Sequence, residues 1–378
     1  MRPSTQLVAA ELIFRRGTPP DARYTFKHAL VQDAAYQSLL KSRRQQLHAA
    51  VGGLLQERFP ATAQATPEML AHHYTEAGLA LQAIPRWFEA GRIAIGRPAY
   101  SEAIAHLSRG LELLKQVPDH SERASFEISL QLTLGAAIEA SRGPVEEVSR
   151  IYARAQELCE QIGNEQQLYV ALWGRWPVES QRMNFEIGRG LVDSLLRLAE
   201  RHGQDDLLLQ AHHAGWTTAL YSGQLQLCNE QAERGIALYD PDRHRHMAAL
   251  YGAHDAGVCS RNHAGLTLWL LGYPDGAARR VADALALAER LAHPFSLCQA
   301  LFVSSVIRQF RRDVEGVREF AERLVATATE HGVSVFRESG VVLWEWSIAA
   351  EGDINEGFEQ MQAGLDALRA MEAGLRRS

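Results

Sequence analysis

Paired histidines are the first residues whose chemistry needs an explanation. His72 stands next to His73, and His212 stands next to His213. Adjacent residues on a helix point about 100° apart, so neither pair can hold one metal ion by itself. A zinc-binding helix places its histidines four residues apart, as in H-E-x-x-H, and neither pair has a partner at that spacing. We interpret these four histidines as packing or solvent-facing residues.

A looser group of histidines comes nearer to a metal site. His244, His246 and His254 lie close together in the sequence. No cysteine or carboxylate framework accompanies them, and isolated histidines more often pack or face solvent. The sequence therefore predicts no metal site and no bound cofactor.

Nucleophilic catalysis and nucleotide binding also lack their motifs. The four cysteines, Cys159, Cys228, Cys259 and Cys298, lie inside apolar helical stripes, where a thiol is usually inert. No serine lies in a G-x-S-x-G motif. A P-loop requires G-x-x-x-x-G-K-[ST], and none of the three lysines follows a glycine. We predict that the chain is not an enzyme.

The elements that would position any site are helices. In residues 273–291 and 355–371, apolar residues recur at three- and four-residue steps, which gives one apolar stripe along a helix. Segments 270–291, 310–332 and 350–374 share one layout, in which a helix ends, a tight turn follows and a second amphipathic helix begins. An earlier copy, 220–240, precedes a longer excursion that contains a predicted loop at 240–246.

Glycines mark the period of this layout. Gly276, Gly316 and Gly357 recur about 40 residues apart, in the range of paired-helix solenoids. Carboxylates near a helix start can accept its unpaired backbone N–H groups. Three aspartates lie at or near the predicted starts of the second helices: Asp275, Asp313 and Asp353.

The clearest repeat is residues 84–117. Five of its residues match key positions of the 34-residue tetratricopeptide pattern: Trp87, Gly91, Ala103, Leu107 and Gly110. We expect Gly91 and Ala103 to let the two helices pack closely, and Trp87 and Leu107 to fill the space between neighbouring pairs.

Tryptophans recur in the first helices of the later units, which keep the layout without this signature. They are Trp173, Trp176, Trp216, Trp269, Trp344 and Trp346. We expect most of them in the core between repeats and some on the concave groove where solenoids bind partners. Trp344 and Trp346 are two residues apart and cannot both face one core.

The first 60 residues differ from the repeats. Residues 12–14 and 24–26, joined by the turn Gly17-Thr18-Pro19-Pro20, predict a short β-hairpin. Helices over about 28–41 and 43–58 follow, and Pro60 and Pro67 end the segment. A hairpin flanked by helices is typical of the end of a winged-helix domain.

FKHALVQDAAYQSLLKSRRQQLHAAVGGLLQERFP (26–60) and the segment 67–119 resemble the region after the ATPase domain in large bacterial multidomain proteins. Those proteins join a class III adenylate/guanylate cyclase domain to an AAA- or STAND-type ATPase and C-terminal tetratricopeptide-like repeats. The resemblance covers about residues 5–120 and is only architectural from 121 to 378. It implies that this chain is a C-terminal regulatory arm, with the cyclase and nucleotide-binding domains upstream of residue 1. Neither domain has a counterpart in the sequence.

His28, in FKHALVQDAAY, is the candidate site residue that this resemblance supplies. In related signalling ATPases a winged-helix histidine can reach the nucleotide phosphates and report their state. The resemblance implies that role for His28 when an ATPase core is present. The alternative is a partly buried histidine that is hydrogen-bonded to nearby backbone.

The charge is unevenly distributed. Residues 1–50 carry eight Lys and Arg against three Asp and Glu, whereas the whole chain has a net charge of −6. The basic patch would permit DNA binding through a winged-helix wing and helix. We favour a solvated surface, or one facing a missing acidic ATPase core, because the rest of the chain is acidic and no recognition helix stands out. The patch consists of Arg15, Arg16, Arg23, Lys27, Lys41, Arg43 and Arg44.

No run of about 18 apolar residues predicts a membrane span. The N-terminal residues do not resemble a secretory signal. Four widely separated cysteines are typical of a reducing compartment, so we expect a cytoplasmic protein.

Together these patterns predict an all-α, right-handed tetratricopeptide-like superhelix of about seven helix pairs, preceded by a winged-helix remnant. The expected domains are residues 1–60, the remnant; 61–120, a leading helix and the first repeat; and 121–378, the remaining repeats. The predicted function is a non-catalytic regulatory or sensor module whose concave groove binds a protein, a peptide or a small effector. The alternatives are a DNA-associated transcriptional regulator of the ATPase–repeat type and a fragment of a truncated gene.

Overall fold

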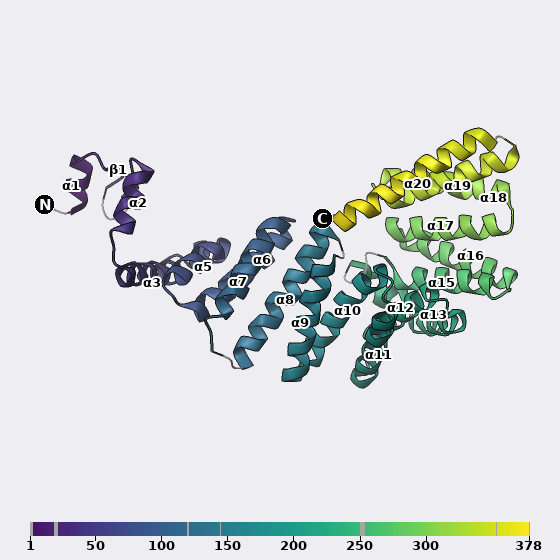
Figure 1. Cartoon of the computed structure of the whole chain (residues 1–378), viewed down its shortest axis with the longest axis horizontal. Coiled ribbons are helices and arrows are strands. Elements are labelled where there is room, and N and C mark those ends of the chain that lie inside the picture. Colours follow the sequence, from purple (N-terminus) through teal and green to yellow (C-terminus); the bar gives the residue numbers. More distant parts are fainter. Residues whose placement is uncertain are drawn as a thin grey trace. The chain divides into compact units, whose positions relative to one another are not determined.

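The computed structural model describes residues 3–18, 22–118, 121–143, 145–249, 254–352 and 354–377. Over these residues it contains twenty α-helices and one two-stranded sheet (Figure 1). The predicted all-α helical-repeat fold is confirmed. The chain divides into two compact units, residues 1–134 (unit 1) and 135–378 (unit 2), and each is described by itself.

Unit 1 contains the predicted hairpin close to its start. Strands β1 and β2 pair antiparallel, with Ile13 opposite Phe26 and Arg16 opposite Arg23, and Ile13 is the buried residue of the pair. Pro19 and Pro20 of the predicted turn lie outside the described residues. A short helix before the hairpin was not predicted. The elements are α1 (Pro3–Ala9), β1 (Ile13–Arg16), β2 (Arg23–Phe26), α2 (Ala29–Gln37) and α3 (Lys41–Arg58).

The two prolines predicted to end this segment also begin helices. Pro60 is the first residue of α4 (Pro60–Ala65), and Pro67 is the first residue of α5 (Pro67–Glu76). Proline fits the first helical position because its N–H would have no partner there and its φ is already helical.

The tetratricopeptide signature forms the pair α6 (Ala80–Gly96) and α7 (Tyr100–Leu114). A Cβ on Gly91 would lie 2.6 Å from Leu107 Cγ, so the small residue does let the helices approach. Leu107 therefore packs inside the pair, whereas we expected it between pairs. Trp87 stacks on His106 and donates from Nε1 to Thr75 Oγ1 of α5 at 2.9 Å, which links the pair to the preceding helix.

Helix pairs continue through unit 2, and α8 (Ser121–Arg142) spans the boundary between the units. From α6 to α20 the described helices form seven successive pairs, α14 aside. The remaining paired helices are α9 (Glu146–Ile162), α10 (Glu165–Gln181), α11 (Phe185–His202), α12 (Asp205–Tyr221), α13 (Leu225–Leu238), α15 (Ala256–Leu270), α16 (Pro274–Leu291), α17 (Pro294–Phe310), α18 (Val314–Glu330), α19 (Ser334–Glu351) and α20 (Ile354–Arg377).

The first helices of the later pairs pack on one another along unit 2. Each packs on its own second helix, and in addition α12 contacts α15, α15 contacts α17 and α17 contacts α19. Stacking neighbours in this way buries a continuous core and leaves one side of the first helices as a shared surface.

Glycines let bulky side chains fill the spaces between these helices. The Tyr152 ring of α9 covers Gly135 of α8 and Gly174 of α10. A Cβ on Gly135 would lie 2.8 Å from Tyr152 Cζ, so each glycine leaves the volume that the ring occupies.

The predicted helix starts are partly confirmed. Asp313 caps α18, because its Oδ1 accepts from the Gly316 backbone N–H at 3.0 Å. Asp275 lies inside the first turn of α16, which begins at Pro274, and so is not the cap. Asp353 lies outside the described residues.

The excursion after α13 is helical, which corrects the predicted loop at 240–246. Asp240 accepts from the backbone N–H groups of Asp242 and Arg243, and this cap starts α14 (Pro241–His244). A 3₁₀ helix (Arg245–Ala249) follows. An aspartate before a proline is itself a helix-start signal, because the carboxylate caps the N–H groups and proline suits the first turn.

Candidate binding surface and histidine cluster

An aromatic row crosses the first helices of unit 2. We define it as the rings of Trp173, His213, His254, Phe295 and Phe336. Successive ring centroids lie 5.6, 4.8, 6.2 and 5.2 Å apart. One ring comes from each of α10, α12, the turn before α15, α17 and α19, so the row spans five repeats.

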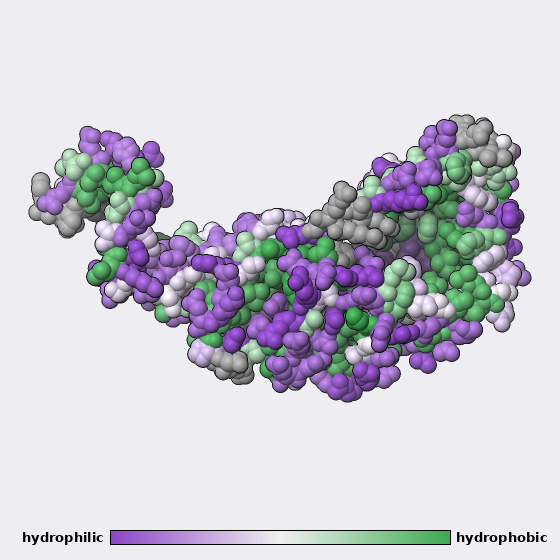
Figure 2. All heavy atoms as spheres, viewed as in Figure 1, coloured by the Kyte–Doolittle hydropathy of each residue, from purple (hydrophilic) through white to green (hydrophobic). Residues whose placement is uncertain are grey.

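The row is accessible along most of its length. His213 is fully buried, but the other four rings are half-buried and keep part of their surface open. Figure 2 shows that unit 2 is hollowed beside α17 and α19, where apolar residues form part of the wall. Half-buried aromatic rings in a line are a surface on which apolar side chains of a partner can pack.

Helix caps fix the starts of α15 and α17, next to two of these rings. Asp255 accepts from the Val258 N–H at 3.0 Å, and His293 Nδ1 accepts from the Ser296 N–H at 3.3 Å. The Asp255 backbone N–H donates to Ser296 Oγ at 2.8 Å, which joins the two starts. His254 and Phe295 are the residues beside these caps, so the caps set their positions.

His213 is the centre of the aromatic packing. Its ring stacks on Trp216 with centroids 5.1 Å apart, and Trp173 and Trp176 lie against it. Burial lowers the pKa of His213 well below its ordinary value, and the neighbouring His254 and His263 lower it further. The ring is therefore neutral near pH 7.

Three side chains that can bind a metal meet beside this ring, and we call His213, His254 and Cys259 the His–Cys cluster. His213 Nε2 lies 3.0 Å from His254 Nε2 and 3.7 Å from Cys259 Sγ. All three atoms lie within 4.8 Å of one another. Burial raises the pKa of the Cys259 thiol to about 12 and lowers the pKa of the adjacent His263 to about 4.

Sequence spacing did not reveal this cluster. Cys259 is 46 residues from His213, and the two meet only because α12 and α15 pack side by side. The structure does not bring together the looser group of His244, His246 and His254 that the sequence suggested. His244 instead accepts from the Asp240 N–H through Nδ1 and lies 3.1 Å from Asp206 Oδ1 through Nε2.

The paired histidines point to different partners. His212 Nδ1 lies 2.5 Å from Gln231 Oε1, away from the His–Cys cluster that His213 joins. In unit 1, His73 Nδ1 lies 2.9 Å from His48 Nδ1, and His72 packs against the same His48 ring. Burial is the main cause that lowers the pKa of His48 and of His73.

The tryptophans occupy the predicted first helices. Trp216 is fully buried and Trp176 is buried, as expected for packing between repeats. Trp176 Nε1 donates to Thr218 Oγ1 at 2.9 Å, which joins α10 to α12. Trp344 is exposed, whereas Trp346 packs against the buried Leu343 cluster, so the two do face different sides.

A buried carboxylate joins three segments near the start of the row. Ser149 Oγ donates to Glu179 Oε1 at 2.5 Å, and Asn184 Nδ2 donates to Glu179 Oε2 at 2.7 Å. Arg175 Nε lies 3.5 Å from the same carboxylate. Burial raises the pKa of Glu179, but these hydrogen bonds and the arginine charge outweigh it and leave the pKa below its ordinary value.

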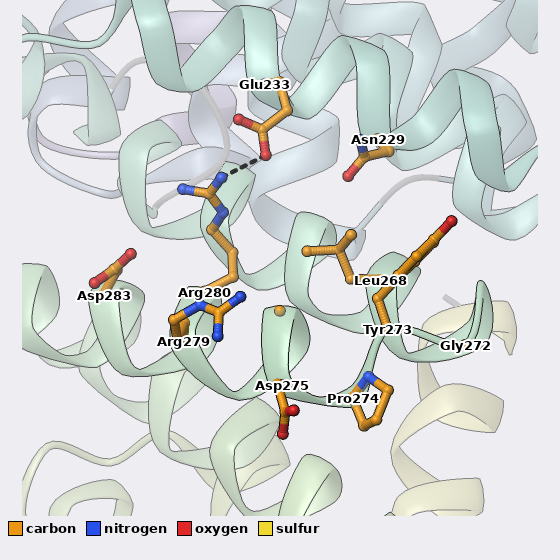
Figure 3. A pocket seen from close by; sticks show the side chains of 11 residues that line it. Asn229, Glu233, Leu268, Gly272, Tyr273, Pro274, Asp275, Arg279, Arg280 and Asp283 are labelled. Carbon is orange, nitrogen blue, oxygen red and sulfur yellow. Dashed lines mark hydrogen bonds and ion pairs between the residues drawn. The ribbon is translucent and has the colours of Figure 1, made fainter.

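A cavity of about 650 Å³ lies on the second helices (Figure 3). Asn229 and Glu233 of α13 face Arg279, Arg280 and Asp283 of α16 across it. Arg280 Nη2 donates to Glu233 Oε1 at 2.6 Å. Its wall carries charges of both signs, part of them already paired, and it is separate from the aromatic row.

His28 is exposed at the start of α2. It is the N-cap residue by backbone position, and its side chain makes no capping hydrogen bond. Its backbone oxygen accepts from the Val31 and Gln32 N–H groups. The partly buried alternative is therefore wrong, and the nucleotide-sensing role stays a prediction.

The basic patch is a solvent-facing surface in this structure. Arg15, Arg16 and Arg23 lie exposed on the hairpin. Lys27 Nζ pairs with Glu11 Oε2 at 2.9 Å.

None of the described helices combines the length and apolar character that a membrane crossing requires.

No protein-family model matches the chain. An uncharacterised protein of Rhizobium meliloti (strain 1021) is 26% identical over 359 residues, which cover 94% of this chain. The chain spans only 34% of the length of that relative.

Solved structures share the fold at low sequence identity. The apo form of RapI has a TM-score of 0.61 at 9% identity and covers 77% of this chain and 99% of its own. The apo quorum sensor NprR from B. thuringiensis has a TM-score of 0.58 at 10% identity and covers 89% of this chain and 90% of its own. The Rap conjugation gene regulator of plasmid pLS20, in complex with the Phr* peptide, has a TM-score of 0.51 at 12% identity, covering 78% of this chain and 77% of its own.

Proposed function

We propose that this chain is a non-catalytic regulatory module that binds an extended peptide, or a protein segment, along the aromatic row of unit 2. The observation that carries the proposal is the row itself, with four half-buried rings supplied by successive repeats. A structure with the same fold, the pLS20 Rap regulator, contains a bound peptide, which supports a peptide as the class of partner.

The spacing of the row suits an extended chain. A strand-like peptide advances about 3.3 Å per residue, so side chains on one of its faces recur about every 6.6 Å. The rings of the row are 4.8 to 6.2 Å apart, close to that repeat. Alternate apolar side chains of the peptide would meet the half-buried rings, such as those of His254, Phe295 and Phe336, and aromatic residues commonly dominate such binding energies.

A random-peptide selection against the purified chain tests this proposal. Affinities of enriched peptides would be measured by fluorescence anisotropy with wild type, Phe295→Ala and Phe336→Ala. We expect each substitution to weaken binding by about 30-fold or more, since loss of an aromatic anchor costs about 2 kcal/mol or more. Tyr273→Ala is the matched control, because Tyr273 is an exposed aromatic residue at the cavity on the second helices.

Two outcomes would reject the peptide surface. One is the absence of any enriched peptide. The other is a set of peptides whose affinity falls with Tyr273→Ala but not with Phe295→Ala or Phe336→Ala.

We further propose that the chain is the regulatory arm of a larger cyclase–ATPase signalling protein. The resemblance of residues 5–120 supports this, as does a relative about three times as long as the chain. Sequencing the genomic DNA upstream of codon 1 tests it. An in-frame P-loop and cyclase domain are expected, and a stop codon directly upstream in every isolate would contradict the proposal.

In that setting, His28 would contact the nucleotide phosphates. Its exposure and its side chain's lack of a capping bond in the described structure support this role. In the full-length protein, His28→Gln should reduce the difference in proteolytic sensitivity between ADP- and ATP-bound states. Gln32→Ala, on the same helix, should not. An unchanged difference in His28→Gln would remove the role.

A further inference from the structure

We propose that the His–Cys cluster is a binding site for a divalent transition-metal ion of the Zn²⁺ type. Its ligands would be Nε2 of His213, Nε2 of His254 and Sγ of Cys259. Imidazole nitrogen and thiolate sulfur are the donors that Zn²⁺ prefers. The proposal does not rest on peptide binding.

The distances between the donor atoms fit a tetrahedral ion. Zn–N bonds of about 2.05 Å and Zn–S bonds of about 2.3 Å, at tetrahedral angles, place two nitrogens about 3.3 Å apart and a nitrogen and a sulfur about 3.6 Å apart. The corresponding distances here are 3.0 Å between the two nitrogens and 3.7 Å from His213 Nε2 to Cys259 Sγ. These two pairs therefore need to move by only a few tenths of an ångström, and the third pair, His254 Nε2 and Cys259 Sγ, lies within 4.8 Å and would close by at most about 1.2 Å.

The groups around the ligands orient them for this role. His213 Nδ1 lies 3.3 Å from Gln210 Oε1, and an N–H on Nδ1 leaves the Nε2 lone pair directed at the cluster. Such an outer hydrogen bond is the usual way a ligating histidine is held. His213 is also clamped between tryptophans, and His254 stacks on Phe295.

His263 is beside the cluster but is not proposed as a ligand. Its Nδ1 lies 2.9 Å from the Cys259 backbone oxygen, an acceptor, so that nitrogen carries the proton. The same Nδ1 is 3.4 Å from Cys259 Sγ, so its one N–H is shared between the carbonyl oxygen and, more weakly, the sulfur. Three protein ligands leave the fourth position of a tetrahedral ion to water or to another donor, as in zinc sites that are not purely structural.

The competing interpretation is a metal-free hydrogen-bonded network, in which one proton lies between the two histidines and the thiol stays protonated. The two interpretations differ in stoichiometry and in spectrum. Zn²⁺ binding would displace the thiol proton, and Co²⁺ in the same site would give a thiolate-to-metal charge-transfer band in the near ultraviolet. A network without a metal site gives neither.

The experiment uses the whole 378-residue chain, stripped with a chelator. Zn²⁺ and Co²⁺ would be titrated by calorimetry and absorption, with Mg²⁺ as a hard cation that should not bind. We expect one Zn²⁺ per chain and a charge-transfer band with Co²⁺. Cys259→Ser and His254→Ala should each lower Zn²⁺ affinity by more than about 100-fold. Loss of a group that only hydrogen-bonds to a ligand costs up to about 100-fold, and loss of a ligand should cost more.

Cys228→Ser is the matched control. Its thiol is also buried and accepts a hydrogen bond from Thr267 Oγ1 at 3.0 Å, but it lies outside the cluster. It should keep both the affinity and the band. Less than one Zn²⁺ per wild-type chain, or wild-type affinity in Cys259→Ser, would overturn the proposal. If circular dichroism shows that Cys259→Ser is unfolded, His254→Ala, at a half-buried position, provides the same test: wild-type Zn²⁺ affinity in that variant would overturn the proposal.

Discussion

At the scale of single residues, glycines matter to this fold because their missing side chains leave room for neighbouring rings. Gly135 and Gly174 leave the space that the Tyr152 ring fills. Gly190 also lies within a helix, α11, but a Cβ there would meet nothing within 4 Å. Gly174 and Gly190 therefore have opposite roles. Packing requires Gly174, whereas Gly190 only weakens its helix.

Gly174→Ala and Gly190→Ala should change stability in opposite directions. The first places a methyl group against a rigid ring and should cost about 1–3 kcal/mol. The second removes a flexible residue from an exposed helix and should add about 0.5–1 kcal/mol. Urea denaturation of each variant measures both, and equal effects at the two sites would contradict this packing.

Thr218→Val tests the bond between α10 and α12. Valine has nearly the same shape as threonine but leaves the buried Trp176 N–H without its acceptor. The expected loss is about 1–3 kcal/mol, the desolvation cost of an unpaired buried donor. Thr217→Val, at the adjacent and less buried position, is the comparison, and a cost at least as large there would rule out this bond as the cause.

The loss of folding stability in acid is expected to depend in part on Glu179. Glu179 has a folded-state pKa below its ordinary value of 4.5, so its ionised form is favoured by folding. That contribution is fully present above pH 4.5 and is lost as the pH falls through the folded pKa. Glu179→Gln should show a shallower loss of stability below pH 4.5 than wild type in acid-dependent denaturation. Parallel curves would show that Glu179 does not contribute.

At the scale of elements, caps and turns determine where the helices of unit 2 begin. Asp255 and His293 cap α15 and α17, and Asp313 caps α18. The sequence predicts Asp313 because this aspartate lies with a glycine in the tight turn before the second helix, which is a local signal. It did not identify His293, since a histidine cap through Nδ1 has no distinctive pattern, and it assigned the capped helix α14 to a loop.

Asp313→Ala should destabilise the chain by about 0.5–2 kcal/mol through loss of its cap on α18. Asp275→Ala, in the first turn of α16 but not capping it, should cost less, because it removes only a helix-dipole interaction and an exposed ion pair with Arg311 at 3.8 Å, both of which stabilise weakly. Thermal unfolding of both variants gives the comparison. A larger loss for Asp275→Ala would mean that the first-turn charge matters more than the cap.

At the scale of the whole molecule, the sequence was informative wherever a pattern repeats locally. Helical spacing, the period of about 40 residues and the signature around Gly91 predict the paired-helix fold. The aromatic row and the His–Cys cluster depend instead on how far each repeat rotates against the next. That rotation decides that Cys259 meets His213 across 46 residues, and no spacing within a repeat encodes it.

The aromatic row gains about one ring with each added helix pair, as Phe295 and Phe336 show for α17 and α19. Because pairs contact mainly their neighbours, duplicating or deleting one whole unit would lengthen or shorten the row while leaving the rest of its geometry in place. The number of helix pairs thus sets the length of the row. Under the proposed peptide-binding function, relatives with more or fewer units would bind longer or shorter segments, and partner length would change in evolution without any change in the rings themselves.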